Sequence, residues 1–211
     1  MGLNLKNVIR KLNIGDRELM NMPMKYWDTA MFDKIPDGSY KDAVRNYLEN
    51  FNHMMKSGIG LLLYGIHGRG KTSIACVVAK VARMYEKSVY FSRASELRDK
   101  ILKYEKFDDG VTILERVKRV DLLIIDDLSK ETKGSEYNEG FWEDLIRIRA
   151  DNYRATIITS NLDKDGLTAF YRESMISVMT EMIVPIEIGG IDYRNTRAEE
   201  IKKVVLGGIL K

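Results

Sequence analysis

The sequence has very little cysteine and histidine. One cysteine, Cys76, and two histidines, His53 and His67, occur among its 211 residues. A single cysteine cannot form an internal disulfide, and so few cysteines and histidines cannot build a Cys/His zinc cluster at the usual ligand spacing. Structural disulfides and structural zinc sites are therefore excluded as the means by which these residues hold their fold.

Long apolar runs and an excess of one charge are also absent. The longest apolar runs, 59–64 and 122–125, are far shorter than the roughly 20 residues that cross a bilayer. Residues 1–20 mix charged with apolar residues and lack the apolar core of a secretory signal. We therefore expect a cytoplasmic protein with no membrane partner. Because 34 basic residues face 31 acidic ones, any nucleic-acid binding must come from a local patch.

Short apolar runs alternate with helical stretches along most of the chain. This order is typical of an α/β domain with an open, mostly parallel sheet, and continuous apolar strands indicate a sheet covered on both faces. The expected strands are 59–64, 88–91, 122–125, 155–159 and 183–188. The expected helices are 40–55, 71–86, two within 95–120 and 141–153, the last with Leu145, Ile148 and Asn152 on one stripe.

A glycine-rich loop follows the first expected strand. The residues from Gly65 to Thr72 match G-x-x-x-x-G-K-T, and a helix-forming run comes next. In such a loop backbone N–H groups turn toward phosphate oxygens, and the lysine reaches the β and γ phosphates while the threonine hydroxyl binds Mg²⁺. The sequence therefore predicts ATP and Mg²⁺ as cofactors. The nucleotide would contact Gly65, Gly68, Arg69, Gly70, Lys71, Thr72 and Ser73.

Polar residues end the third and fourth expected strands. Asp126 and Asp127 follow an apolar strand, and Asn161 follows the apolar strand that begins at Ala155. Ligands of open α/β sheets gather at the carboxyl ends of the strands. We expect Asp126 to hold Mg²⁺ with Thr72, and Asp127 to orient or deprotonate the attacking water. Asn161 can hydrogen-bond the γ-phosphate and that water.

With these motifs in place, the chain resembles the AAA+ ATPases of the DnaC-like helicase-loader and IstB-like transposition-helper group. The resemblance covers roughly residues 23–194 and rests on 26–27 with 32 and 35–36, and on 65–72, 122–128, 156–161 and 185–194. It implies a P-loop three-layer sandwich with a parallel five-stranded sheet of order 5-1-4-3-2 and no separate lid domain. It also implies that Asp126 and Asp127 form the Walker B pair, Asn161 is sensor 1, and Arg194 is the nucleotide-touching arginine of sensor 2. Lys71, Asp127, Asn161 and Arg194 are thus the expected catalytic residues.

The chain departs from this family at two places. Where the family inserts an arginine into the neighbouring subunit's ATP site, the matching stretch here has Val178. Because an arginine finger supplies about 10³ to 10⁵ in turnover in other nucleotide hydrolases, we expect slow hydrolysis unless Arg172 or another arginine substitutes. Family loaders also carry a helicase-binding domain, whereas here residues 1–35 form an amino-terminal segment before a core at 36–211. Its residues 3–19 have an amphipathic stripe that docks on a partner or packs on the core.

Basic and aromatic residues alternate in the two helices expected within 95–120. Cationic side chains follow a phosphate backbone and aromatic faces accept unstacked bases, so this region could contact single-stranded DNA. In the loader and initiator families the corresponding region tracks single-stranded DNA. Acidic residues nearly balance the charge, so an ordinary solvated helix pair is an equal alternative. The candidate DNA-binding residues are Arg98, Lys103, Tyr104 and Lys106.

Three functions fit the sequence. The first is an ATP-binding loader that places a replicative helicase on DNA, with the helicase, single-stranded DNA and copies of itself as partners. The second is an IstB-like transposition helper, which has the same core and governs a transposase on duplex DNA. The third is a small-molecule kinase. The Asp-Asp and Thr-Ser-Asn strand ends favour water as the phosphoryl acceptor over a small molecule.

Overall fold

A single parallel sheet organises the part of the chain that the structure describes. The computed structural model describes residues 12–104, 109–128, 136–170, 173–190 and 192–206. Within these ranges five strands pair in the order β2-β3-β4-β1-β5, and every pairing is parallel. This is the predicted order 5-1-4-3-2 counted from the opposite edge. The strands are β1 (Gly60–Tyr64), β2 (Val89–Arg93), β3 (Leu122–Asp126), β4 (Ala155–Thr159) and β5 (Ile183–Glu187).

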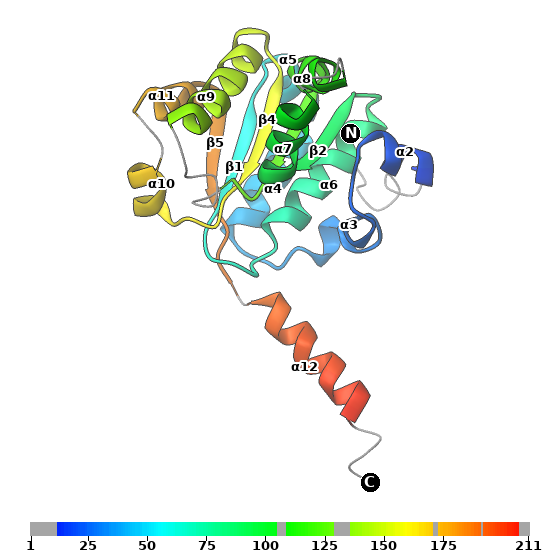
Figure 1. Ribbon diagram of the computed structural model, residues 1–211. Coiled ribbons are helices and arrows are strands. Elements are labelled where there is room, and N and C mark those ends of the chain that lie inside the picture. The colour runs from blue at the N-terminus through cyan, green and yellow to red at the C-terminus, as the bar shows by residue number, and fades with distance from the viewer. Residues whose placement is uncertain (1–11, 105–108, 129–135, 171–172, 191, 207–211) are drawn as a thin grey trace.

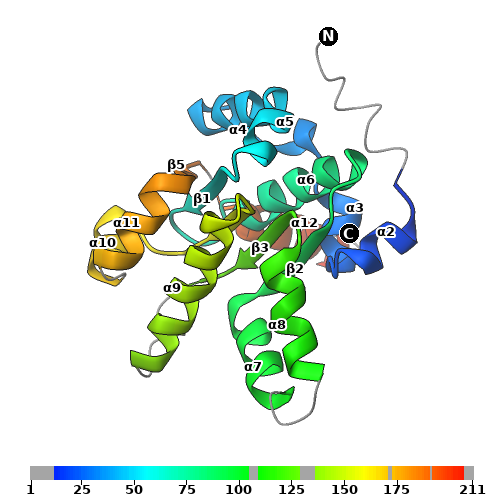
Figure 2. The same ribbon diagram turned by 90° about the horizontal axis from the view of Figure 1, so that it is seen from above.

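Helices cover both faces of the sheet, which makes the predicted three-layer sandwich (Figures 1 and 2). One layer contains α3 (Met24–Thr29), α4 (Ser39–Glu49), α5 (Phe51–Lys56) and α6 (Lys71–Met84), with α2 (Ile14–Leu19) beside β2 and the 3-10 turn η2 (Phe32–Lys34) before α4. The other layer contains α7 (Ala94–Tyr104), α8 (Asp109–Arg119), α9 (Glu136–Asp151), α10 (Lys164–Phe170) and α11 (Glu173–Met182). The helix α12 (Tyr193–Leu206) points away from the sandwich (Figure 1).

Alternate residues of each strand enter different cores. In β3, Leu122 and Ile124 pack with α6, whereas Leu123 and Ile125 pack with α7, α8 and α9. All four side chains are fully buried. Because both faces are covered, the strand has no solvent side, and this explains its unbroken apolar run.

Two predicted helices differ from the structure in detail. The run expected as one helix over 40–55 is two helices, because the backbone leaves the helical region at Asn50 (φ −99°, ψ 18°). The stripe expected on α9 is displaced: Trp142, Leu145 and Ile146 are buried, whereas Ile148 is 37% exposed. The stripe is completed by the fully buried Arg149, a charged residue that apolar periodicity cannot identify.

The described part of the amino-terminal segment packs on the sandwich. Met20 and Met22 are fully buried in the core on the α6 side, and the backbone of Met20 accepts a hydrogen bond from Phe91 in β2. The buried ammonium group of Lys80 in α6 donates to the carbonyls of Trp27 and Ala30 at 2.5 and 2.8 Å. Residues 3–11 of the stripe expected over 3–19 lie outside the described residues. In its described part, Ile14 and Leu19 are half exposed.

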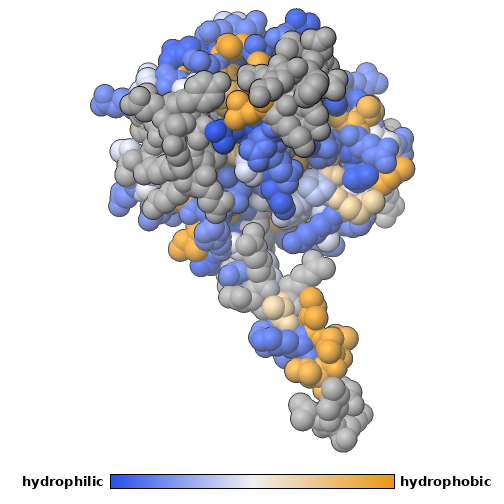
Figure 3. Space-filling view, viewed as in Figure 1, coloured by the Kyte–Doolittle hydropathy of each residue, from blue (hydrophilic) through white to orange (hydrophobic). Residues whose placement is uncertain are grey.

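The segment after β5 has a different environment. In α12, Ile201, Val204 and Val205 are each more than half exposed, and Figure 3 shows their apolar surface on the helix. A membrane span needs a long helix of low charge, and no helix among the described residues meets that requirement.

Candidate functional site

The glycine-rich loop connects β1 to α6, as predicted. Gly70 caps α6 with a left-handed backbone (φ 91°), a conformation that strains residues with a Cβ atom. Lys71 is buried, and its ammonium group donates to the carbonyls of Gly65 and Ile66 at 2.7 and 2.8 Å. The first turn of α6 presents its N–H groups to the same space. The loop therefore offers both a cation and a helix amino terminus to an anion.

The carboxylate of Asp126 lies at the centre of a hydroxyl network. Thr72 from α6 and Thr159 from β4 both donate to its Oδ1 atom at 2.8 Å. The Thr159 hydroxyl also accepts the backbone N–H of Asp127 at 2.8 Å. Three elements that are distant in sequence, α6, β3 and β4, thus converge on one oxygen atom.

Asp127 and Asn161 face each other across the ends of β3 and β4. Asp127 has a left-handed backbone (φ 62°), which is uncommon for a residue other than glycine. Its carboxylate accepts a hydrogen bond from the amide of Asn161. The polar turn after β4 is fixed in place, because Ser160 donates its backbone N–H to Leu63 in β1 at 2.9 Å.

Burial raises the pKa of the Asp126 carboxyl group above its ordinary value. The hydrogen bonds from Thr159 and Thr72 oppose this shift, the neighbouring Asp127 adds to it, and the guanidinium of Arg93 opposes it. The net direction is upward because desolvation disfavours the charged form most strongly. A buried carboxylate that costs free energy in this way is typical of a functional site.

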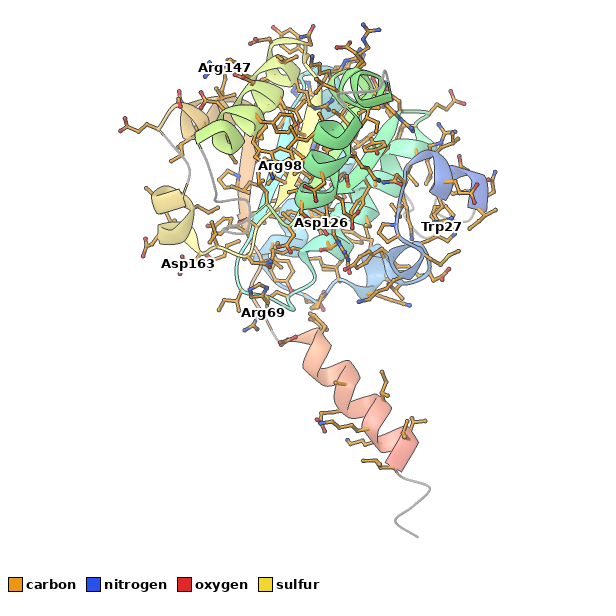
Figure 4. All side chains as sticks on the ribbon, in the orientation of Figure 1. Trp27, Arg69, Arg98, Asp126, Arg147 and Asp163 are labelled. Atoms are coloured by element: carbon orange, nitrogen blue, oxygen red, sulfur yellow. The ribbon has the colours of Figure 1, made fainter. Side chains whose placement is uncertain are left out.

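These side chains line one cavity of about 390 Å³ at the carboxyl edge of the sheet. Figure 4 labels two residues of this cavity: Asp126 within the sandwich and Arg69 near the start of α12. The predicted site residues in its wall are Gly68, Arg69, Gly70, Lys71, Thr72, Ser73, Asp126, Asp127 and Asn161. Gly65 is not in the wall, but its carbonyl holds Lys71.

The cavity wall also contains residues that sequence reasoning did not assign to the site. Thr159 belongs to the polar Thr-Ser-Asn end of β4, and its hydroxyl connects Asp126 to Asp127. The others of interest are Lys25 of α3, Arg93 at the end of β2, Ser95 in the first turn of α7, and Tyr193. Tyr26 of α3 also lines the cavity, and it belongs to the lead-in 26–27 on which the family resemblance rests. Thr159 could have been found from its position two residues before Asn161. Arg93 could have been found from its place at the end of β2.

The first turn of α12 contacts the phosphate-binding loop. The backbone N–H of Tyr193 donates to the carbonyl of Gly68 at 3.0 Å. Gly68 has a left-handed backbone (φ 79°), and a Cβ atom there would lie 2.0 Å from the carboxylate of Asp192, which would have to move. The backbone of Arg194 belongs to α12, but its side chain lies outside the described residues. Its predicted contact with nucleotide therefore remains a prediction.

A second cavity adjoins the first. It has a volume of about 650 Å³ and is lined by the residues before α4, from Pro36 to Tyr40, and by Glu187, Gly189, Gly190 and Tyr193. Because Tyr193 lines both cavities, they meet at this side chain.

The other predicted residues lie away from these cavities or outside the described residues. Arg98 is partly buried on α7, the side chains of Lys103 and Tyr104 are outside the described residues, and so is all of Lys106. Val178 of α11 is 9% exposed and packs in the core. That position therefore presents no side chain to a neighbouring molecule. Arg172, the suggested substitute, is also outside the described residues.

The donor set around Asp126 fits a magnesium ion. Mg²⁺ prefers oxygen ligands and usually takes one or two carboxylates together with substrate phosphates and water. The Thr72 hydroxyl and the Asp126 carboxylate are oxygen donors 2.8 Å apart at the amino terminus of α6. No cluster of three or more histidine, cysteine or acidic residues suited to a metal occurs in the described ranges, so phosphate oxygens would have to complete the coordination.

Residues 48–185 match the family model of the IstB-like ATP binding protein. Sequence comparison with curated proteins finds no match.

Several solved structures share the fold. The DnaC helicase loader has a TM-score of 0.69 at 24% identity, covering 79% of this chain and 100% of that one. DnaI has a TM-score of 0.69 at 23% identity, with 84% and 98% covered. AMPPCP-bound DnaA from Aquifex aeolicus has a TM-score of 0.65 at 19% identity, with 84% and 56% covered. The sheet order and the loop after β1 are thus those of a P-loop AAA+ fold.

Proposed function

Because this chain belongs to the family of IstB-like ATP-binding proteins, we propose that it is a DnaC-like ATPase that loads a replicative helicase onto DNA. One observation carries the ATP part of the proposal. Lys71, Thr72, Asp126, Asp127 and Asn161 come from three separate stretches of sequence and line a single cavity. That set supplies phosphate binding, metal binding and water activation in one place.

Each of these residues has a role that its contacts support. Lys71 leaves the carbonyls of Gly65 and Ile66 to bind the β and γ phosphates. Thr72 and Asp126 hold Mg²⁺, which when bound neutralises charge on the phosphate oxygens. Asp127 accepts a proton from the attacking water, and Asn161 orients Asp127 through their hydrogen bond. Arg194, on the helix whose first turn contacts the loop, contacts the nucleotide.

The second cavity is suited to the base of the nucleotide. It adjoins the phosphate cavity at Tyr193, and Tyr40 gives it a second aromatic side chain. Aromatic faces stack on nucleobases without demanding a particular pattern of hydrogen bonds.

Hydrolysis is proposed to be slow. Val178 occupies the position at which family members carry the arginine finger, and it is buried in the core. An arginine finger accounts for about 10³ to 10⁵ in turnover where it has been measured in other nucleotide hydrolases. A chain without one is better suited to hold ATP for a long time than to turn it over rapidly.

The decisive experiment for ATP binding is calorimetric titration of ATP with Mg²⁺. The wild-type protein should bind, and Lys71→Ala should weaken binding at least about tenfold because it removes the cation of the loop. Lys56→Ala is the matched control, because Lys56 is exposed at the end of α5. Absence of binding by the wild-type protein, or equal binding by Lys71→Ala, would contradict the proposal.

Single-stranded DNA is the proposed nucleic-acid partner, through Arg98, Lys103, Tyr104 and Lys106 of α7 and the turn that follows it. Lys103→Ala combined with Lys106→Ala should weaken binding of a labelled oligonucleotide and flatten its salt dependence, because fewer phosphate contacts remain. ATP affinity should not change. Salt dependence identical to that of the wild-type protein would show that α7 is an ordinary solvated helix.

A transposition helper is the second candidate, and the IstB-like family match favours it. The two functions differ in their partner. A loader should retain the replicative helicase in a pull-down with ATP. A transposition helper should instead assemble on duplex DNA in an ATP-dependent manner.

A further inference from the structure

Arg93 and Asp126 end neighbouring strands of the sheet. They are paired in register in the parallel β2–β3 ladder, so their backbones are adjacent. Side chains alternate along a strand, and Val89 and Phe91 of β2 are buried on the α6 side. Arg93 has the same parity, so it projects toward the α6 layer, as Asp126 does when it meets Thr72.

The position of Arg93 matches the γ-phosphate end of the cavity. Lys71 at the start of α6 and the Thr72–Asp126 pair mark the β and γ phosphates and their metal. Arg93 lines the same cavity and stands beside Asp126. An ATP molecule bound in this way would place its γ-phosphate, the group that distinguishes it from ADP, at the end of the cavity that Arg93 lines.

The guanidinium of Arg93 is free to change partner. Its ion pair with Glu96 is 3.3 Å long, and the two side chains are 59% and 49% exposed. Exposed pairs of this kind contribute about 0 to 1 kcal/mol, so a phosphate group can compete for the guanidinium. Arginine is the residue best suited to this exchange, because its planar fork matches two phosphate oxygens.

We propose that Arg93 binds the γ-phosphate of ATP from within the same chain, so that the protein distinguishes ATP from ADP without an arginine from a neighbouring molecule. This inference rests on the proposed ATP-binding function. It supplies from β2 a γ-phosphate contact that the Val178 position does not provide, worth about 10² in turnover against about 10³ to 10⁵ for an arginine finger, so hydrolysis remains slow.

The same contact acts during hydrolysis. The oxygen of water forms a bond to the γ-phosphorus while the bond from that phosphorus to the bridging oxygen breaks. ADP leaves with the electron pair of the broken bond, and the proton of the water passes to the Asp127 carboxylate. Charge grows on the γ-phosphoryl and bridging oxygens, and the Arg93 guanidinium stabilises it.

The test compares ATP and ADP affinity for the wild-type protein, Arg93→Ala, Arg93→Lys and Arg147→Ala. Arg147 is a suitable control because it is an exposed arginine paired with Glu143 on α9, far from Asp126 in Figure 4. We expect Arg93→Ala to lose about tenfold or more in affinity for ATP while its ADP affinity stays within about twofold. Arg93→Lys should recover part of the loss, and Arg147→Ala should match the wild type.

Turnover supplies a second readout. Arg93→Ala should lower single-turnover hydrolysis about 10²-fold or more, the scale of losing one transition-state donor. Turnover per molecule in the wild-type protein should not depend on protein concentration, because the arginine belongs to the same chain. Turnover per molecule that rises with protein concentration overturns the inference. An Arg93→Ala protein whose affinities for ADP and ATP fall equally also overturns it.

Failure of this inference is distinguishable from failure of the proposed function. A wild-type protein that binds neither nucleotide contradicts the function. A wild-type protein that binds both, with Arg93→Ala keeping the same preference for ATP over ADP, contradicts the role of Arg93 alone.

Discussion

The charged carboxylate of Asp126 is suited to binding a cation, but it lowers the stability of the folded protein. Burial raises the pKa of its carboxyl group, so the folded state binds that proton more tightly than the unfolded state does. The folded state therefore loses relative stability as the pH rises through this pKa. The charged form of Asp126, which would hold a cation, therefore lowers the free energy of unfolding.

Replacing Asp126 with asparagine should remove that cost. The amide oxygen can still accept the hydroxyls of Thr72 and Thr159, so the network survives. We expect Asp126→Asn to raise the free energy of unfolding of the nucleotide-free protein by about 0.5 to 2 kcal/mol near neutral pH. The gain should shrink as the pH falls through the raised pKa of the wild-type carboxyl group, and stabilisation by ATP with Mg²⁺ should disappear.

Urea unfolding at several pH values measures this effect. Asp144→Asn, at an exposed position on α9, is the control and should show neither change. An Asp126→Asn protein that is less stable than the wild type at neutral pH would contradict the assignment.

Sequence could identify the site residues that belong to a contiguous motif or follow an apolar run. Lys71 and Thr72 are marked by the glycine spacing, and Asp126 by the abrupt end of β3. Arg93 and Thr159 also stand at the ends of strands, but strand pairing is what brings them to Asp126. Whether these two residues reach the site depends on which strands are neighbours in the sheet. The spacing of residues in the sequence does not determine that order.

Arg149 shows how one charged residue joins several elements. It is fully buried in α9, and its guanidinium donates to the Thr156 hydroxyl and to carbonyls at the ends of α8 and at the starts of β3 and β4. Burial lowers its pKa to about 9, which still leaves it protonated at neutral pH. Amphipathic periodicity assigned α9 a different stripe because a charged residue is normally placed on the solvent side.

Removing this guanidinium should strongly destabilise the protein. Arg149→Ala leaves several buried carbonyl groups without a donor and a cavity beside them, so we expect a loss of about 3 to 5 kcal/mol in the free energy of unfolding. Arg147→Ala lies two residues away on the exposed side of the same helix and should change stability by less than about 0.5 kcal/mol. Similar midpoints for the two variants in chemical denaturation would contradict this role.

The strands were predictable as elements because they are short and apolar, and β1, β2, β3 and β4 are buried over at least four of their five residues. The break at Asn50 was harder to predict. The residues on both sides of it have a helical pattern, and only the backbone of Asn50 leaves the helical region. Residues 20–35 were also ambiguous. Their attachment depends on Lys80, a lysine among apolar residues in the middle of α6 whose partners are backbone carbonyls.

At the scale of the whole molecule, α12 is connected to the site mainly through its first turn. The hydrogen bond from Tyr193 to Gly68 joins it to the loop, whereas Ile201 to Leu206 are exposed. Stabilising the loop with a ligand should therefore stabilise the start of α12 and leave its end unchanged.

Hydrogen exchange can measure this connection. With ATP and Mg²⁺ at about 100 times the Kd, amides at the start of α12 should exchange up to about 100-fold more slowly, the limit set by ligand stabilisation of about 2.7 kcal/mol. Amides of 201–206 are the internal control and should be unaffected. Equal slowing along the entire helix would indicate that it docks as a unit.

The two hydrogen bonds that Lys71 makes to its own loop also bear on which solutes can enter. An entering anion must offer more than the two carbonyl oxygens that it displaces. Chloride or a lone orthophosphate gives the ammonium group a single small partner, whereas a polyphosphate adds contacts to the neighbouring N–H groups and to a metal. In a solution that contains many small anions, Lys71 would therefore be released from its loop only by multiply charged solutes that contact several groups at once.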